Sequence, residues 1–137
     1  MSDALHWSAA YLGRPWVSGE HDCWGFFRAV QEERFGRAIP AVSVDAESAA
    51  ACVEAIATLQ APRAGWRPLA DGDAPEEGDA VLLARKAAAA HVGVWIAADG
   101  GGVLHCQRGA GVLFLPRRSL ARAGWGRIEL FRWVGTP

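Results

Sequence analysis

The sequence predicts an α+β fold, because its helical patterns precede its strand patterns along the chain. Apolar residues at one-face helical spacing occupy the first half, whereas the second half contains five short apolar runs separated by turn signals. The connections ADGGG and QRGAG are too short for parallel crossovers, so we expect N-terminal helices packed on an antiparallel sheet of about five strands. A length of 137 residues suits a single domain spanning residues 1–137.

Three helices are expected before the sheet. Asp22 can cap the second helix and Gly36 can end it. The stretch APRAGWRPLADGDAPEEGD after the third helix is dense in Gly, Pro and Asp, which predicts an irregular connection. The expected helices cover about residues 3–12, 23–35 and 46–60, and the five expected strands begin at Ala80, His91, Gly102, Gly111 and Arg127.

Composition excludes several classes of partner. Fourteen Lys and Arg against fifteen Asp and Glu give a net charge of -1, so we expect neither nucleic-acid binding nor a polybasic membrane surface. No apolar run approaches the ~20 residues that span a bilayer. The N-terminal stretch lacks the basic start and apolar core of a signal peptide, which favours synthesis in the cytoplasm.

Three cysteines cannot all pair within one chain, and none has the spacing of a zinc site. We therefore expect neither a disulfide framework nor a structural metal site. Cys52 lies among alanines in the third expected helix, and Cys106 points away from its neighbour His105 in a strand. Both are expected to be small core residues.

Cys23, in the stretch GEHDCWGFF, has three interpretations: a nucleophile, a metal ligand with His21, or a buried apolar residue. The metal interpretation lacks further ligands at suitable spacing. A helix N-terminus favours the thiolate form of a cysteine and supplies backbone N–H groups that can stabilise an oxyanion. The position of Cys23 therefore favours the nucleophile.

A general base for this thiol must come from the four histidines. His91 opens one expected strand and His105 lies within the next one. Adjacent antiparallel strands can place both rings on one face, one as base and the other as its orienting partner. His21 remains an alternative base, since it lies two residues before Cys23 but has no visible orienting partner.

The ordered motifs YLGRPWVSGEHDCWGFF, EEGDAVLL, HVGVW and VLHC resemble those of the NlpC/p60 cell-wall cysteine peptidases, which have a compact papain-like fold. The resemblance spans Tyr11 to about Cys106 and is nearest to the short branch associated with bacteriophage tails. It implies amide hydrolysis through an acyl-enzyme thioester, without a metal or organic cofactor. The implied substrate is the stem peptide of peptidoglycan, often cut between D-glutamate and a diamino acid.

Carried over residue by residue, the resemblance implies that Cys23 is the nucleophile, His91 the general base and His105 the residue that orients His91. Trp16 stands where many members have tyrosine, and Trp24 stands where serine is common. With Asp22, these two tryptophans are the expected substrate-binding residues. The bulk of Trp24 either packs in the core or narrows the substrate groove.

Two alternative functions remain. A non-catalytic module of a phage tail or tail tip, binding other tail proteins, would keep the fold without cleaving anything. Another papain-like amidase or acyltransferase would act on lipid or glutathione-like amides. For the leading interpretation, the expected final location is a virion tail or the outside of the cell after assembly or lysis.

Overall fold

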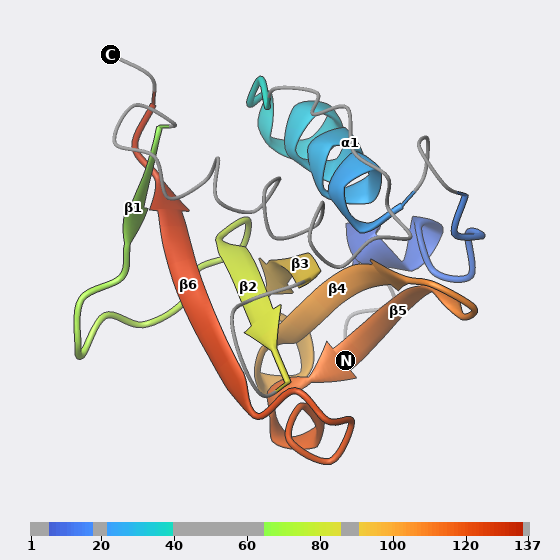
Figure 1. Cartoon of the computed structure of the whole chain (residues 1–137). Helices are drawn as coiled ribbons and strands as arrows, with labels where there is room; N and C mark the ends of the chain where they lie inside the picture. Colours follow the sequence, from blue (N-terminus) through green and yellow to red (C-terminus); the bar gives the residue numbers. More distant parts are fainter. Residues whose placement is uncertain (1–5, 18–21, 40–64, 86–90, 136–137) are drawn as a thin grey trace.

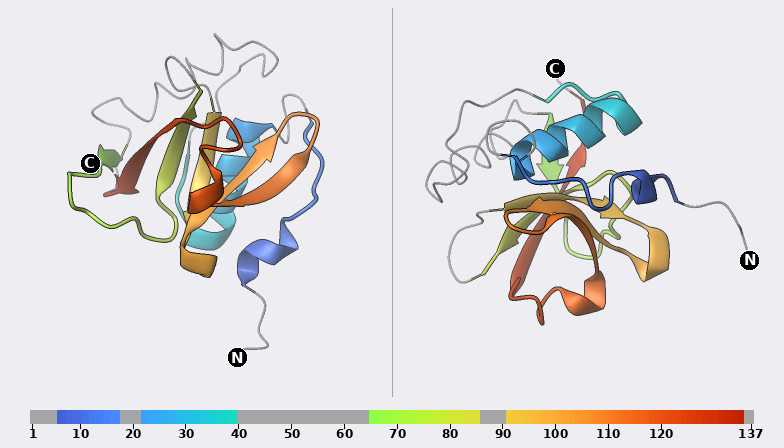
Figure 2. Two further views of the ribbon diagram at one scale, coloured as in Figure 1. Left: turned by 90° about the horizontal axis from the view of Figure 1, so that it is seen from below. Right: turned by 90° about the vertical axis from the view of Figure 1, so that its right-hand side faces the viewer.

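The computed structural model describes residues 6–17, 22–39, 65–85 and 91–135 of the chain. Within these ranges it has a single α-helix, α1, which lies over one face of a curved sheet (Figure 1). The turned views show the same two layers (Figure 2). The fold is therefore α+β. In chain order the elements are η1 (Trp7–Ala10), α1 (Cys23–Phe35), β1 (Trp66–Pro68), β2 (Ala80–Ala84), β3 (His91–Ile96), η2 (Ala98–Gly100), β4 (Gly102–Gln107), β5 (Gly111–Pro116), η3 (Arg117–Ser119) and β6 (Arg127–Trp133).

The described strands form one antiparallel sheet of six, in the order β1-β6-β2-β3-β4-β5. The expectation of about five strands was therefore one too few. The additional strand is β1, which lies in the stretch expected to be irregular and pairs Trp66 with Trp133 at the edge of the sheet. A strand of three residues is too short to show the alternation on which a prediction depends.

Helix α1 begins and ends where the sequence predicts. The Asp22 carboxylate accepts a hydrogen bond from the Gly25 amide at 2.7 Å, and Gly36 ends the helix in the left-handed conformation with φ 67°. Phe27 and Val30 are fully buried on the side that packs against β3 and β4. Burial of an aromatic side chain such as Phe27 contributes roughly 1.5–3 kcal/mol.

The sheet separates two apolar cores. Leu104 and Cys106 of β4 belong to the first core, against α1, whereas Val103, directly before Leu104, belongs to the second core on the other face. The second core consists of Val81, Leu83, Trp95, Val103, Leu120 and Trp125. The first core consists of Tyr11, Cys23, Trp24, Phe26, Phe27, Val30, Ile39, Trp66, Ala80, Leu82, Val92, Val94, Ile96, Leu104, Cys106, Val112 and Phe131.

The dipeptide Gly78-Asp79 before β2 joins α1 to the sheet. Arg132 of β6 donates two hydrogen bonds to the buried Asp79 carboxylate, at 3.1 Å from Nε and 2.8 Å from Nη2. Gln31 of α1 donates to the Gly78 carbonyl at 3.0 Å. Gly78 has φ +94°, and a Cβ there would lie 2.9 Å from the ring of Phe35. The motif EEGD therefore has a structural role in this chain.

The other expected helices differ from α1. In the described part of the first one, a 3₁₀ helix, η1, replaces the expected α-helix, and its first turn is capped by His6, whose Nδ1 accepts from the Ser8 amide at 3.1 Å. The third expected helix, residues 46–60, lies outside the described residues, as does Cys52.

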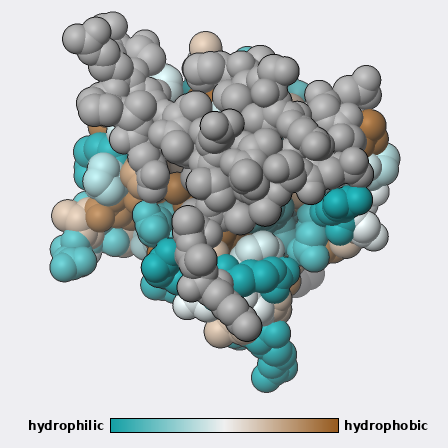
Figure 3. All heavy atoms as spheres, viewed as in Figure 1, coloured by the Kyte–Doolittle hydropathy of each residue, from teal (hydrophilic) through white to brown (hydrophobic). Residues whose placement is uncertain are grey.

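On the face drawn in Figure 3, apolar side chains show near β1 and the end of β6, where Val134 is 59% exposed. A search of the described helices finds none that could span a membrane.

Candidate active site

Cys23 is the first residue of α1, immediately after the capping Asp22. The Asp22 side chain holds the Gly25 amide and its carbonyl accepts from the Phe26 amide at 2.9 Å, so the first turn is fixed. Cys23 is 7% exposed and belongs to the first core. The amide dipoles at this end of a helix favour a negative charge, which is the physical reason that a thiol here is a candidate nucleophile.

His91 and His105 meet on the two strands that pack beneath α1. His91 Nε2 lies 2.8 Å from His105 Nδ1, and the rings are perpendicular, with centroids 4.9 Å apart and an interplanar angle of 85°. Gly93 permits this approach, because a Cβ at that position would lie 3.1 Å from His105 Cβ and 2.4 Å from Val103 Cγ1. The glycine of HVGVW is thus required by the close packing of β3 on β4.

Both histidines are uncharged at neutral pH. Burial, together with the charges of His105 and Arg85, lowers the pKa of His91 from 6.5 to about 3. Burial also lowers the pKa of His105 to about 4. A neutral imidazole donates through one nitrogen and accepts through the other. The 2.8 Å contact therefore joins one donor to one acceptor.

The tautomers of the two rings are linked through this contact. If His91 donates from Nε2, its Nδ1 is an acceptor, and His105, accepting at Nδ1, carries its own proton on Nε2. His105 is fully buried, and its Nε2 has no hydrogen-bond partner within the described structure. The opposite tautomer would put a proton on His91 Nδ1 and prevent that nitrogen from acting as a base.

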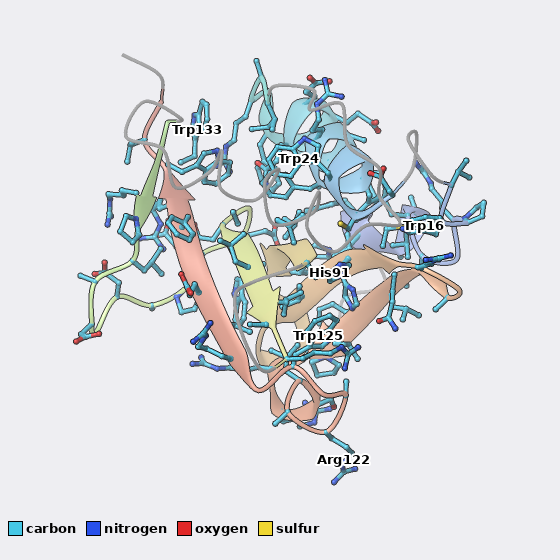
Figure 4. All side chains as sticks on the ribbon, in the orientation of Figure 1. Trp16, Trp24, His91, Arg122, Trp125 and Trp133 are labelled. Carbon is cyan, nitrogen blue, oxygen red and sulfur yellow. The ribbon has the colours of Figure 1, made fainter. Side chains whose placement is uncertain are left out.

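Trp125 covers one face of His91. The two rings are stacked, with centroids 5.1 Å apart and an interplanar angle of 8°. Figure 4 shows Trp125 on the side of His91 away from α1. The guanidinium of Arg85 lies 4.0 Å from the centroid of the same indole. No local sequence pattern links Trp125, in the loop before β6, to the start of β3.

The three expected substrate-binding residues have different surroundings. Trp16 is half-buried against the first core, with Arg108 over its ring at 5.7 Å. Asp22 is buried and caps α1. Trp24 is only 4% exposed and packs against Phe27 with centroids 5.6 Å apart. Its placement in the first core favours the packing interpretation over a contact with substrate.

A cavity of about 310 Å³ lies beside α1, between the helix, β5 and the segment before the helix. Figure 2 shows that segment running between α1 and the sheet. The walls are mostly apolar, and the exposed side chains Arg14 and Glu33 add one charge of each sign. The lining residues are Arg14, Pro15, Phe26, Ala29, Glu33, Cys106 and Val112.

Cys106 contrasts with Cys23. It is 1% exposed in the first core, and burial, together with the charge of Asp22, raises the pKa of its thiol to about 11. Such a thiol is almost entirely protonated at neutral pH and is a poor nucleophile. His21, the alternative base, lies outside the described residues. A search of the described side chains for groups of three or more His, Cys, Asp or Glu that could hold a metal ion finds none.

Comparison with known proteins identifies the family. No curated protein matches the chain. The model of the NlpC/P60 family matches residues 12–128 of the 137, a span that includes Cys23, both paired histidines, strands β1 to β5 and the first two residues of β6. The architecture of a helix on an antiparallel sheet is consistent with that match. The chain therefore belongs to the NlpC/P60 family, whose members are generally cysteine hydrolases that act on peptidoglycan peptides.

Proposed function

We propose that the protein is a cysteine peptidase that hydrolyses amide bonds in peptidoglycan stem peptides, with Cys23 as nucleophile, His91 as general base and His105 as the residue that orients His91. The main support is the 2.8 Å hydrogen bond between the two buried imidazoles. The bond joins β3 to β4 on the face opposite the one that packs against the Cys23 helix. Membership of the NlpC/P60 family supports the reaction class.

The proposed reaction begins with transfer of the Cys23 proton to His91 Nδ1, while Nε2 stays bonded to His105. The thiolate attacks the carbonyl carbon of the scissile amide, and the backbone N–H groups at the start of α1 stabilise the oxyanion. His91 then protonates the leaving amine as the C–N bond breaks, which leaves a thioester on Cys23. Water, deprotonated by His91, hydrolyses the thioester and restores the thiol.

The electrostatics of the site leave His91 neutral and distinguish the two cysteines. The pKa of His91 is lowered to about 3, so the ring is neutral at physiological pH and one of its nitrogens can accept a proton, although this low pKa does not itself favour the transfer. Cys23 has the helix N-terminus to favour its thiolate. Cys106 lies within β4 and not at a helix N-terminus, and the pKa of its buried thiol is raised to about 11, so its thiolate is not favoured. Of these two cysteines, Cys23 is therefore the proposed nucleophile.

We place part of the peptide substrate in the cavity beside α1. Phe26, one helical turn after Cys23, forms part of its wall, whereas Cys23, His91 and His105 do not line it. A stem peptide carries both carboxylate and amino groups, which complement Arg14 and Glu33. Trp16 lies in the segment before α1 that borders the cavity. We propose that it forms an aromatic wall of the substrate site, since its side chain is only half-buried.

The non-catalytic alternative drew some support from Trp24 and Trp16, whose bulk could block the groove. The ring of Trp24 is buried in the first core, which removes that part of the support. We retain as part of the proposal that the enzyme is made in the cytoplasm and acts from a phage tail, because its motif series is nearest to that branch. Mass spectrometry of purified virions tests this location directly.

The activity test is digestion of purified peptidoglycan followed by mass spectrometry of the muropeptides. We expect the wild-type protein to release new amino termini and Cys23→Ala to release none while keeping its circular dichroism spectrum. Cys52→Ala and Cys106→Ala are the matched controls and should retain cleavage. Intact stem peptides after incubation with the folded wild-type protein would contradict the proposal and favour the structural role. Cleavage by Cys23→Ala would reject the assigned nucleophile.

A further inference from the structure

Two rings restrain His91 in perpendicular directions. The indole of Trp125 is parallel to the imidazole, at an interplanar angle of 8°, and therefore covers a face. The imidazole of His105 meets it edge-on at 85°, with the 2.8 Å hydrogen bond between them. Rotation of the His91 ring about its bond to Cβ would break both contacts at once. Trp125 thus acts on the same ring that the proposed reaction uses as base.

Arg85, directly after β2, ties Trp125 in place. Its guanidinium lies 4.0 Å from the indole centroid, and its Nη1 donates to the Ala123 carbonyl at 3.1 Å. The backbone leaves room for it at Gly124, where φ is +98° and a Cβ would lie 2.1 Å from Arg85 Nη1. The Trp125 amide donates to the Leu120 carbonyl at 3.0 Å. Arg85 therefore contacts both the ring and the backbone of the loop that carries it.

We propose that Trp125, held by Arg85, is a positioning residue that fixes the ring plane of His91 and keeps water from the His91–His105 hydrogen bond. The inference rests on the proposed role of His91 as general base. Trp125 does not touch the reacting atoms in this scheme. It acts by limiting the orientations and the hydration of the imidazole, so that His91 Nδ1 keeps pointing in one direction.

The electrostatic surroundings agree with this role. The described charged or titratable groups that act on His91 are His105 from β4 and Arg85 from the end of β2. Burial is the first cause of its lowered pKa, and Trp125 supplies part of that burial on the face it covers. Loss of the indole should admit water and let the pKa of His91 rise toward its ordinary value of 6.5.

Trp95 provides a matched control within the same core. It is 4% exposed against 7% for Trp125, and it also lies beneath a guanidinium, with Arg117 5.7 Å from its ring. Both tryptophans belong to the second core. Trp95 follows His91 by four residues along β3, about 13 Å away in an extended strand. Its replacement removes similar packing without uncovering the imidazole.

The test compares Trp125→Leu, Trp125→Phe and Trp95→Leu, using NMR titration of the labelled His91 ring and kcat and KM for stem-peptide cleavage. We expect Trp125→Leu to raise the pKa of His91 by at least one unit and to lower kcat on the order of 10-fold, with KM little changed. Trp125→Phe keeps a stacked ring, so its His91 pKa and its kcat should both be close to those of the wild-type protein. Trp95→Leu should lower the melting temperature and leave the His91 titration unchanged.

Arg85→Met keeps the test decisive if Trp125→Leu does not fold, because Arg85 is exposed and its removal leaves the core intact. We expect a fall in kcat smaller than that of Trp125→Leu, which Arg117→Met should not produce. The pKa of His91 is not the readout for this variant, because removal of the Arg85 charge raises it directly. Unchanged His91 titration and kcat in Trp125→Leu, or equal changes in Trp95→Leu, would overturn the inference. If the NMR shifts occur but the wild-type protein cleaves nothing, the positioning role stands and the proposed function fails.

Discussion

The two faces of β3 and β4 hold different kinds of side chain. On the face toward α1, Val92 and Leu104 are fully buried in an apolar core. On the other face, His91 and His105 form a buried polar pair beside Trp125. Because successive side chains of a strand point to opposite faces, two short strands can serve the core and the chemistry at once. Mutations of neighbouring residues on these strands should therefore affect either activity or stability, according to the face on which each residue lies.

The sharpest contrast is between His91 and Val92. We expect His91→Ala to lower kcat/KM for stem-peptide cleavage by on the order of 10³-fold, because the general base is lost, with little change in secondary structure. Val92→Ala should instead lower the free energy of unfolding by about 1–3 kcal/mol, since it opens a cavity in the first core. Activity of the folded Val92→Ala protein should stay near that of the wild type.

The comparison would fail if His91→Ala were as active as the wild-type protein. In that case the base would have to be sought elsewhere, with His21 as the first candidate. Cleavage assays at equal concentrations of folded protein, with urea titration of both variants, distinguish these outcomes.

A second contrast, between His105 and Cys106, should have a smaller effect. His105→Gln keeps an acceptor for His91 Nε2, so we expect kcat to fall by about 10-fold to 100-fold, and His105→Ala to be more damaging than His105→Gln. Cys106→Ala removes a small buried side chain and should alter stability more than kcat. Equal loss of kcat in His105→Gln and Cys106→Ala would mean that the face of β4 on which a residue lies does not determine its effect on activity.

The smallest effect concerns acid stability. Folded His91 and His105 have pKa values of about 3 and about 4, below the unfolded value of 6.5, so the unfolded chain binds more protons as the pH falls. Their contribution to stability is complete above pH 6.5 and is lost progressively below it, by up to about 1.4 kcal/mol per pH unit for each ring. Urea titration between pH 6.5 and pH 5 measures this slope.

The double variant His91→Gln/His105→Gln is the control for this slope. It lacks both buried imidazoles, so its stability should be much less dependent on pH in the same interval. A slope equal to that of the wild-type protein would show that other groups cause the acid sensitivity, and that the paired histidines are not buried in the neutral form.

Much of the fold could be predicted from local pattern. The expected strand starts from Ala80 to Arg127 coincide with β2 through β6, because apolar runs of five to seven residues between turns leave a clear signal. The capped helix at Cys23 was equally clear. The strand β1 was missed because three residues carry no periodicity, and its pairing with β6 depends on distant contacts.

The site was only partly predictable, because some of its contacts join residues that are distant in the sequence. Adjacent antiparallel strands allowed His91 and His105 to share a face, and the structure confirms that they meet. Nothing near Trp125 or Arg85 in the sequence indicates that they stack beside His91, since that contact arises from the path of the loop before β6. The burial of Trp24 likewise depends on which side of α1 meets the sheet.

The most direct measurement is identification of the acyl-enzyme. The protein is mixed with excess stem peptide, quenched in acid during turnover, digested and mapped by mass spectrometry. We expect the peptide that contains Cys23 to carry the acyl half of the cleaved substrate, and the peptide that contains Cys106 to stay unmodified. An adduct on Cys106, or stem-peptide cleavage that persists in Cys23→Ala, would contradict the assignment of Cys23 as the nucleophile.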